Sequence, residues 1–308
     1  MKRIFITGGA GFIGSAIVRK LINNGYDVVV YDNLSYGKKN FLPESDSLIF
    51  IEGDINETDR LRKAIIDSNA HCVYHLAAIH FIPDCNSNPS KALQVNVVGT
   101  ESVLNACNNN GMKQIILAST AAVYPINDFP NIEDKTPAKP IDIYGYSKLF
   151  SEMLLKKFQK ETGIQSIALR LFNAVGPRET NPHVIPHIFL SAKDTDLIPL
   201  GNLEPRRDYI HVDDIATAFL QITKNRTDVN GFDIFNVGSG NEYSVIDLTK
   251  MIGNLLGREL IVEKRNERVR NIERMHLVSD ISKIKKTIGW EPKINLEEAL
   301  LDTAKYYQ

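Results

Sequence analysis

The sequence predicts an α/β protein with a doubly wound parallel sheet and a smaller α/β carboxy-terminal lobe. In the first half of the chain, short apolar runs alternate with amphipathic stretches, and a glycine-rich turn follows the first run. After Phe172 this rhythm changes. Alternating strands and helices imply a parallel sheet with helices on both faces, so the first half forms the sheet and the remainder forms the lobe.

The apolar runs are rich in Val and Ile and are apolar almost throughout, as strands buried on both faces are. We predict strands at residues 4–7, 28–31, 49–52, 72–76, 114–118 and 166–171. We predict helices between them at residues 14–23, 57–67, 90–109 and 144–162.

The second half is less regular, because proline and histidine interrupt the pattern between residues 177 and 205. Beyond this stretch we predict helices at 212–224, 244–256 and 282–288 and a strand at 232–237. Ser244 is the expected cap of the second of these helices, and Gly289 ends the third.

These patterns divide the chain into two domains. We predict that residues 1–172 form a dinucleotide-binding domain and that residues 173–308 form a substrate-binding lobe. Residues near 209–236 should pack back on the first domain. No repeat or flexible linker separates the two parts, so they should pack tightly.

Composition excludes several classes of function. The 308 residues are 43% hydrophobic and 24% charged, with a net charge of −1, which is unlike the basic surface of a nucleic-acid-binding protein. No run of 18 apolar residues could span a membrane. The three cysteines, Cys72, Cys85 and Cys107, are scattered and form no CxxC pair, which favours a reduced, cytoplasmic setting.

The turn after the first strand predicts a dinucleotide site. It reads TGGAGFIG over residues 7–14, directly between a predicted strand and a predicted helix. Gly8 permits the tight turn, Gly11 lets the backbone approach a pyrophosphate, and Gly14 allows close packing of the helix. The amino terminus of that helix, which follows Phe12 and Ile13, offers free N–H groups to phosphates. The fold is therefore of the Rossmann type.

Asp32 indicates which dinucleotide is bound. It follows Gly14 by 18 residues, at the end of the second strand. A carboxylate there accepts hydrogen bonds from ribose hydroxyls and repels a 2′-phosphate, which favours NAD over NADP. Lys38 and Lys39 lie nearby and could bind a phosphate, so the preference is not absolute. Asp54 ends the third strand and could hold the adenine amino group or, alternatively, begin the next helix.

Tyr144 and Lys148 form a candidate catalytic pair. They lie four residues apart on a predicted helix, which places them on one face. A neighbouring ammonium lowers the pKa of a tyrosine, so that its hydroxyl can exchange a proton with an alcohol while hydride moves to nicotinamide. Ser119 and Thr120 follow the fifth strand, at the sheet edge where ligands bind, and Thr120 could orient the same substrate oxygen.

The motifs lie along nearly the whole chain. They are TGGAGFIG at 7–14, DNL at 32–34, GDI at 53–55, HLAA at 75–78, NVVGT at 96–100, STAAVY at 119–124, YGYSK at 144–148, RLFN at 170–173 and RDYIHVDD at 207–214. Together they resemble the extended short-chain dehydrogenases, and in particular the NAD-dependent epimerase/dehydratase group that acts on nucleotide sugars.

The resemblance implies a set of site residues. The implied catalytic residues are Thr120, Tyr144 and Lys148. The implied cofactor-binding residues are Gly8, Gly11, Phe12, Ile13, Gly14, Asp32, Asn33, Asp54, Ile55, Leu76, Ala77, Ala78, Asn96, Ser119, Tyr144, Lys148 and Phe172. The implied substrate-binding residues are His80, Thr120, Asn173, His183, Val184, Arg207 and Arg270. Arginine suits a diphosphate because its planar guanidinium pairs with phosphate oxygens, and Arg268 and Arg274 lie close to Arg270 in the sequence.

Departures from the family pattern narrow the chemistry. Dehydratases of this family carry Asp-Glu after the catalytic Thr, whereas this chain has Ala121-Ala122, whose methyl groups cannot act as acid or base. The His80-Phe81-Ile82-Pro83 segment could shape the choice of sugar. His183 and His187 are four residues apart, but Pro182 and Pro186 argue against a regular helix there, and we predict a substrate-covering loop and no metal site.

The favoured interpretation is NAD-dependent epimerisation at carbon 4 of a nucleotide-activated sugar through a 4-keto intermediate. The alternative is a reductase of a 4-keto-6-deoxy sugar nucleotide of the dTDP-4-dehydro-6-deoxyglucose type, which would use exchangeable NADH or NADPH. A non-catalytic NAD-binding regulator is a third possibility, which the intact Thr120, Tyr144 and Lys148 set disfavours. The resemblance also implies a homodimer built from the helices at 90–109 and 144–162.

Overall fold

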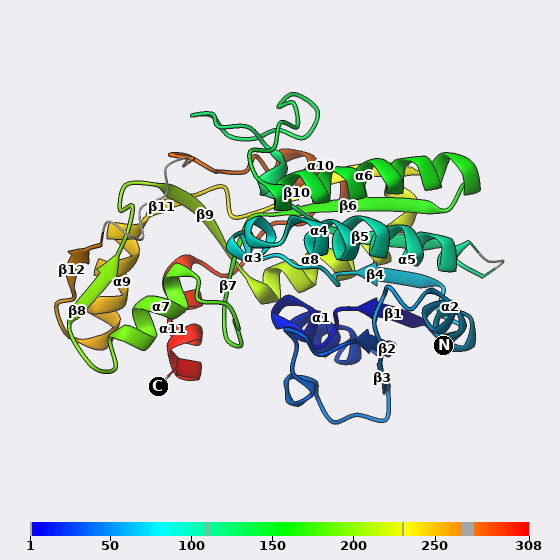
Figure 1. Ribbon diagram of the computed structural model, residues 1–308, viewed down its shortest axis with the longest axis horizontal. Helices are drawn as coiled ribbons and strands as arrows, with labels where there is room; N and C mark the ends of the chain where they lie inside the picture. The colour runs from blue at the N-terminus through cyan, green and yellow to red at the C-terminus, as the bar shows by residue number, and fades with distance from the viewer. Residues whose placement is uncertain (1, 109–110, 230, 266–273, 308) are drawn as a thin grey trace.

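A seven-stranded parallel sheet organises the first part of the chain (Figure 1). The computed structural model describes residues 2–108, 111–229, 231–265 and 274–307. The strands of this sheet are β1 (Arg3–Thr7), β2 (Asp27–Asp32), β3 (Leu48–Glu52), β4 (Cys72–His75), β5 (Gln114–Thr120), β6 (Gln165–Leu171) and β10 (Phe232–Val237). Their order is β10-β6-β5-β4-β1-β2-β3, which confirms the predicted doubly wound sheet.

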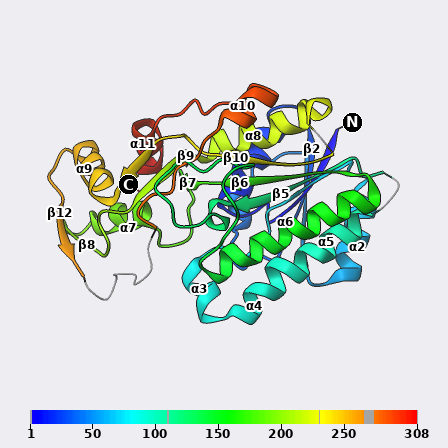
Figure 2. The same ribbon diagram turned by 90° about the horizontal axis from the view of Figure 1, so that it is seen from above.

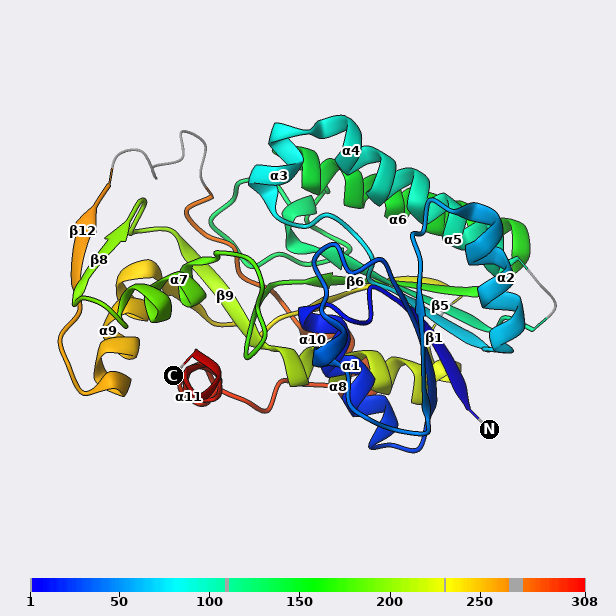
Figure 3. The same ribbon diagram turned by 60° about the horizontal axis from the view of Figure 1, so that its bottom comes forward.

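Helices cover both faces of this sheet (Figure 3). One face carries α1 (Phe12–Ile22), α8 (Val212–Lys224) and α10 (Ser282–Ile288), and the other carries α2 (Thr58–Ser68), α5 (Gly99–Cys107) and α6 (Ile143–Thr162). Successive residues of β1 alternate between the two cores: Ile4 and Ile6 pack with the first group of helices and Phe5 with the second. Burial on both faces explains why the strand sequences are apolar throughout.

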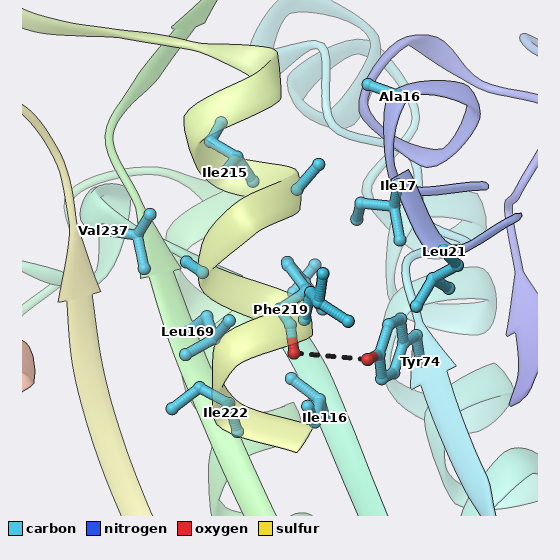
Figure 4. Close-up of a cluster of buried hydrophobic side chains, with 14 of the residues drawn as sticks. Ala16, Ile17, Leu21, Tyr74, Ile116, Leu169, Ile215, Phe219, Ile222 and Val237 are labelled. Carbon is cyan, nitrogen blue, oxygen red and sulfur yellow. Dashed lines mark hydrogen bonds between the residues drawn. The ribbon is translucent and has the colours of Figure 1, made fainter. Parts of the chain in front are cut away.

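Helix α8 shows how the second half of the chain completes the first. Its apolar residues, including Ile215, Phe219 and Ile222, pack against the sheet and against α1 (Figure 4). The Tyr74 hydroxyl donates to the Phe219 carbonyl at 3.2 Å, which ties β4 to this helix. Strand β10 then pairs with β6 in parallel register.

The remaining elements form a smaller lobe at one end of the sheet (Figure 2). Its strands are β7 (Asn173–Val175), β8 (Leu197–Leu200), β9 (Arg206–His211), β11 (Glu242–Ser244) and β12 (Ile261–Lys264), and its helices are α7 (Val184–Ser191), α9 (Val245–Leu256) and α11 (Leu296–Tyr307). Strands β11, β9 and β7 form one sheet and β12 and β8 another. A separate apolar core joins α7, α9 and α11 to these strands.

Local signals account for several helix ends. Ser244 caps α9 in a capping box with Asp247, and Gly289 ends α10 in the left-handed region, as predicted. Asp213 and Asp214 lie in the first turn of α8, near its positive end. No helix in the described part of the chain is long and apolar enough to cross a membrane.

One prediction about helices is confirmed with a modification, and one is wrong. The helix predicted at 90–109 is present as one uninterrupted helical stretch in the described residues, formed by α4 (Pro89–Leu93), a π-helical turn η2 (Gln94–Val98) and α5 (Gly99–Cys107). The stretch around His183 and His187 is not a loop, because α7 begins at Val184. Pro186 is tolerated there since it occupies the first turn, where backbone N–H groups have no partner within the helix.

Candidate active site

A cavity of about 1260 Å³ lies at the carboxyl ends of the parallel strands and extends to the smaller lobe. It opens beside β1 and β4, which are adjacent in the sheet although β2 and β3 separate them in the chain. That is the point where the strand order reverses, where doubly wound folds bind their ligands. Of the predicted site residues that the structure describes, all but Asn96 line it.

The glycine turn forms one wall of the cavity. Gly8 has a φ of +73°, and a Cβ there would lie 2.6 Å from the Ala77 nitrogen. A Cβ on Gly14 would collide with the Gly8 carbonyl, so Gly14 is needed to fold the turn against its own helix. Gly11 is the N-cap of α1, and no side chain of the described residues caps that end. The first N–H groups of α1 therefore face the cavity and fit a pyrophosphate.

Asp32 stands beside this turn. One of its carboxylate oxygens accepts from the Ala10 amide at 2.9 Å and the other from the Leu34 amide at 2.8 Å. Burial raises the pKa of Asp32, and these two amides oppose the shift. Asn33 donates to Asp54 at 2.7 Å, and Asp54 also accepts from the Asn56 amide at 2.8 Å. The Asp54 side chain thus stabilises the loop before α2. The carboxylates of Asp32 and Asp54 both line the cavity.

The wall after β4 contains Leu76, Ala77 and Ala78. Asn96, predicted to line the cofactor, lies behind this wall and is fully buried in the π-helical turn. Its amide side chain accepts from the Ile79 amide at 2.8 Å and donates to the Ile79 carbonyl and the Ser147 hydroxyl, both at 2.9 Å. Asn96 therefore fixes the segment that follows β4 instead of contacting the cavity.

Thr120, Tyr144 and Lys148 meet at the floor of the cavity. Thr120 ends β5, and Tyr144 and Lys148 occupy successive turns of α6. Lys148 Nζ donates to the Ala118 carbonyl at 2.9 Å, and the Tyr144 hydroxyl shares a hydrogen bond with Thr120. The three polar groups are thus presented from two rigid elements.

The protein groups around Tyr144 do not produce the expected lowering of its pKa. Burial raises the pKa of Tyr144, and the Thr120 hydrogen bond opposes this only in part. Burial lowers the pKa of Lys148 to about 8. The reason is that the protein alone desolvates both groups, which disfavours the charged form of each.

The start of α6 explains how Tyr144 reaches Thr120. The Asp142 side chain accepts from the Gly145 amide at 2.8 Å and so caps the helix. A Cβ on Gly145 would collide with the Ala122 carbonyl, so glycine permits the first turn of α6 to press against the segment after β5. Further along, buried Glu152 accepts from Ser119 at 2.6 Å and from Arg170 at 2.7 and 2.9 Å, which locks α6 to β5 and β6.

Arginines and Asn173 lie at the lobe side of the cavity. Arg207 Nη1 donates to the carbonyls of Arg206 and Arg274 at 2.8 and 2.7 Å. Arg274 is buried and donates to the carbonyls of Ala122 and Tyr124 at 3.0 and 3.3 Å, which connects the lobe to the end of β5. Arg270, predicted to bind substrate, lies outside the described residues.

Histidines gather at the same end. His80 Nε2 and Asn181 Nδ2 are 2.7 Å apart, and burial lowers the pKa of His80 to about 4. His183 Nδ1 lies 3.2 Å from a Glu179 carboxylate oxygen, and Val184 follows it as the first residue of α7. Among the described residues no group of three His, Cys, Asp or Glu side chains is placed to hold a metal ion.

Sequence reasoning missed several residues of the cavity wall. Glu179, Tyr36, Asn202 and Tyr209 line it, and Arg274 does so beside its structural contacts. Tyr36 follows Asp32 by four residues, and this closeness to a predicted cofactor-binding residue is a signal that the sequence does contain. Glu179 had no recognisable signal, because its position depends on contacts with His183 and on the Tyr307 hydroxyl, which donates to its carbonyl at 2.8 Å.

A doubly wound sheet with an uncapped glycine turn and a Tyr-x-x-x-Lys pair at its switch point defines a dinucleotide-dependent oxidoreductase of the short-chain dehydrogenase type. The family model described as "NAD dependent epimerase/dehydratase family" matches residues 4–238. The chain belongs to this family, as its motifs predicted.

Several similar proteins align with nearly the full length of this chain. A UDP-glucose 4-epimerase of Lactobacillus helveticus is 30% identical, over 99% of this chain and 97% of the relative. The structure of UDP-glucose 4-epimerase from Brucella ovis in complex with NAD has a TM-score of 0.91, 29% identity and coverage of 100% and 98%. That of UDP-N-acetylglucosamine 4-epimerase from Methanobrevibacter ruminantium in complex with UDP-N-acetylmuramic acid has a TM-score of 0.89, 32% identity and coverage of 99% and 98%.

Proposed function

We propose that this protein is an NAD-dependent 4-epimerase of a UDP-activated sugar. The observation that carries the proposal is the Thr120, Tyr144 and Lys148 set at the floor of a cavity whose opposite wall is a phosphate-binding glycine turn. The similar proteins described above are 4-epimerases of UDP-glucose and UDP-N-acetylglucosamine. NAD, when bound, accepts a hydride from carbon 4 and returns it.

The side chains divide the proton chemistry among them. Tyr144 removes the proton of the sugar 4-hydroxyl and later returns it to the 4-keto oxygen, and Thr120 orients that oxygen. The positive charge of Lys148 offsets the desolvation cost of a phenolate at Tyr144. The positive charge of oxidised nicotinamide would act in the same direction. Ala121 and Ala122 offer no acid or base, so the 4-keto sugar is not dehydrated.

The lobe side of the cavity supplies the substrate contacts. Arg207, Asn173 and Arg270 bind the diphosphate in this proposal, and His80, His183 and Val184 surround the sugar. Support comes from the position of Asn173 and Arg207 on the cavity wall and from a lobe core that fixes the adjoining helix α7.

The proposal is tested in buffer that contains no added cofactor. The purified protein is incubated with UDP-glucose, UDP-N-acetylglucosamine, UDP-glucuronate and a dTDP-4-keto-6-deoxyhexose, and the products are followed by NMR. We expect one of the UDP-sugars to epimerise without added NAD. Consumption of NADH or NADPH in equal amount with the 4-keto sugar, with no epimerisation, would establish the reductase instead.

A homodimer is part of the proposal. Tyr146, Phe150 and Met153 form an exposed apolar stripe on α6, at 47%, 49% and 58% exposure, and Leu93 and Val98 are exposed on the adjoining helical segment. A stripe of this kind on paired helices suits association with a second copy. Phe150→Asp should give a monomer by analytical ultracentrifugation, whereas an exposed charge change on another element, such as Lys305→Glu on α11, should leave the dimer intact.

We also propose that residues 1–172 bind the cofactor and 173–308 the sugar nucleotide. The return of β10 to the large sheet and of α8 to α1 supports the prediction that residues near 209–236 pack on the first domain. The three cysteines are buried and unpaired, which supports a cytoplasmic location.

A further inference from the structure

The loop that follows β2 is hydrogen-bonded to the glycine turn both at its start and at its end. Before the loop, Asp32 accepts from the Ala10 amide at 2.9 Å. After it, the Lys38 amide donates to the Ala10 carbonyl at 3.0 Å. Gly37 permits this approach, because a Cβ there would lie 2.8 Å from the carbonyl carbon of Ala10. The loop is therefore a short arch with both ends fixed to the turn.

Tyr36 extends from this arch to helix α3 (Ile82–Ser87). Its hydroxyl donates to an Asp84 carboxylate oxygen at 2.9 Å. Its ring lies beside that of His80, with ring centroids 6.2 Å apart. Both residues of the hydrogen bond are half-buried, so the bond is partly shielded from water. This contact joins segments that are 48 residues apart in the chain.

The topology shows what this contact crosses. Strand β1 lies between β2 and β4 in the sheet. The arch follows β2 and α3 follows β4, so a bond between them spans the carboxyl end of β1, where the glycine turn lies. Tyr36 lines the same cavity as Gly11 and Ile13, so the Tyr36–Asp84 contact and the glycine turn border one cavity.

We propose that the Tyr36–Asp84 hydrogen bond is a clasp that retains the dinucleotide through the catalytic cycle. The clasp rests on the proposed function, since an epimerase returns hydride to the same substrate and gains nothing from releasing its cofactor. Release of the pyrophosphate from the glycine turn requires the arch and α3 to separate. That separation breaks a bond between a neutral donor and a charged acceptor.

The test measures how fast bound NAD leaves the holoenzyme. Released NAD is trapped by excess alcohol dehydrogenase and ethanol, and NADH is followed by fluorescence. Tyr36→Phe keeps the ring and removes only the hydroxyl, so we expect release to accelerate about tenfold, as the loss of one such bond predicts. Asp84→Ala should behave alike, whereas Asp84→Asn, which keeps an acceptor oxygen, should release NAD more slowly than Asp84→Ala.

Two further variants separate the clasp from general loosening. The double variant Tyr36→Phe with Asp84→Ala should release NAD no faster than either single variant, because one bond is removed in all three. Tyr74→Phe removes a buried hydroxyl between β4 and α8, away from the cavity, and should leave the release rate unchanged. Equal acceleration in Tyr74→Phe would assign the effect to lost stability and overturn the clasp.

The outcomes keep the two proposals apart. Release from Tyr36→Phe and Asp84→Ala within twofold of the wild-type rate overturns the clasp, even where the wild type epimerises a UDP-sugar. Accelerated release in both variants supports the clasp, even where no UDP-sugar is epimerised and the proposed function fails. A wild-type protein that is purified without NAD and binds none on addition overturns the clasp as well.

Discussion

The cofactor end and the substrate end of the cavity are built in different ways. At the cofactor end, the glycine turn directly joins β1 to α1, Asp32 is the last residue of β2, and Tyr144 lies in the first turn of α6. At the substrate end, segments far apart in sequence are joined by side chains that bond to backbone carbonyls, as Arg274 does with Ala122 and Tyr124. Asp208, fully buried nearby, accepts from both the amide and the hydroxyl of Ser239 and of Ser279.

This difference places the groups that react and the groups that recognise the substrate in different parts of the cavity. The reacting groups stand on elements that the sheet holds rigidly, which suits proton transfer over fixed distances. The recognition groups stand on a lobe whose loops can differ between proteins while the reaction stays the same. Changes at the cofactor end should therefore affect turnover, and changes at the substrate end should affect affinity.

The largest effect is expected from Tyr144→Phe. It removes the hydroxyl that we propose exchanges the proton of the sugar 4-hydroxyl, and kcat should fall by about 100-fold or more, as for other lost general acids and bases. NAD content after purification should equal that of the wild type, because the ring remains in place. Near-wild-type kcat in this variant would show that another group moves the proton.

A smaller effect is expected at the substrate end, from Arg207→Ala. It removes a guanidinium from the cavity wall and should weaken binding of the UDP-sugar by about 1.5–3 kcal/mol, as measured by calorimetry, with NAD binding unchanged. Arg206→Ala is the matched control, since Arg206 pairs with Glu242 and Asp247 outside the cavity. Equal losses in the two variants would contradict a role for Arg207 at the site.

The next prediction concerns how the free energy of unfolding depends on pH. It tests whether His75, buried at the end of β4, stays neutral in the folded protein. Burial and the Lys148 charge lower the pKa of His75 to about 3, and its ring nitrogens contact the Thr7 and Thr100 hydroxyls at 2.7 and 3.0 Å. In the unfolded chain the same histidine has a pKa of about 6.5. The unfolded chain therefore binds a proton that the folded chain does not, between pH 6.5 and about pH 3.

In this window the free energy of unfolding should decrease as the pH falls, by about 1.4 kcal/mol per pH unit for this one proton. Above pH 6.5 this contribution should be constant. The measurement is urea denaturation at a series of pH values, with His75→Gln for comparison. The variant should show a shallower slope, and identical slopes would mean that His75 is protonated in the folded protein.

The smallest effect is expected from Asp32→Asn. The amide oxygen can accept from only one of the Leu34 and Ala10 amides, and the variant loses the charge that would face the ribose, so the preference for NAD over NADP should narrow by about fivefold. Calorimetric titration of the apoprotein with both cofactors measures the ratio. A wild-type protein with equal affinity for both would contradict the role of Asp32 in selection.

The sequence was most informative where local rules decide the structure. Buried parallel strands, the glycine turn and the Tyr144–Lys148 spacing were all predicted, because each depends on a few neighbouring residues. Strands β7 and β11 were missed, since three-residue strands depend on distant partners such as β9. The cavity role of Glu179 was missed for the same reason.

Helix α11 had a signal in the sequence, whereas the position of Asn96 had none. Helix α11 carries buried residues at Leu296, Ala299, Leu300, Thr303 and Ala304, a helical spacing that the sequence displays plainly. Asn96 was assigned to the cofactor on resemblance alone. Its place in a π-helical turn, which points the side chain back toward Ile79, could not be inferred from helical periodicity.

Strand β10 has a consequence for how the chain acquires its structure during synthesis. It covers the outer edge of β6, whose seven residues are all buried in the finished fold. Ribosomes add about 5–20 residues per second, so β6 leaves the ribosome several seconds before its neighbour. Until then β6 is an exposed apolar edge, which invites pairing with other chains. Nascent chains that are stalled before β10 is complete at Val237 should therefore need chaperones. Fragments that end before β10 should aggregate.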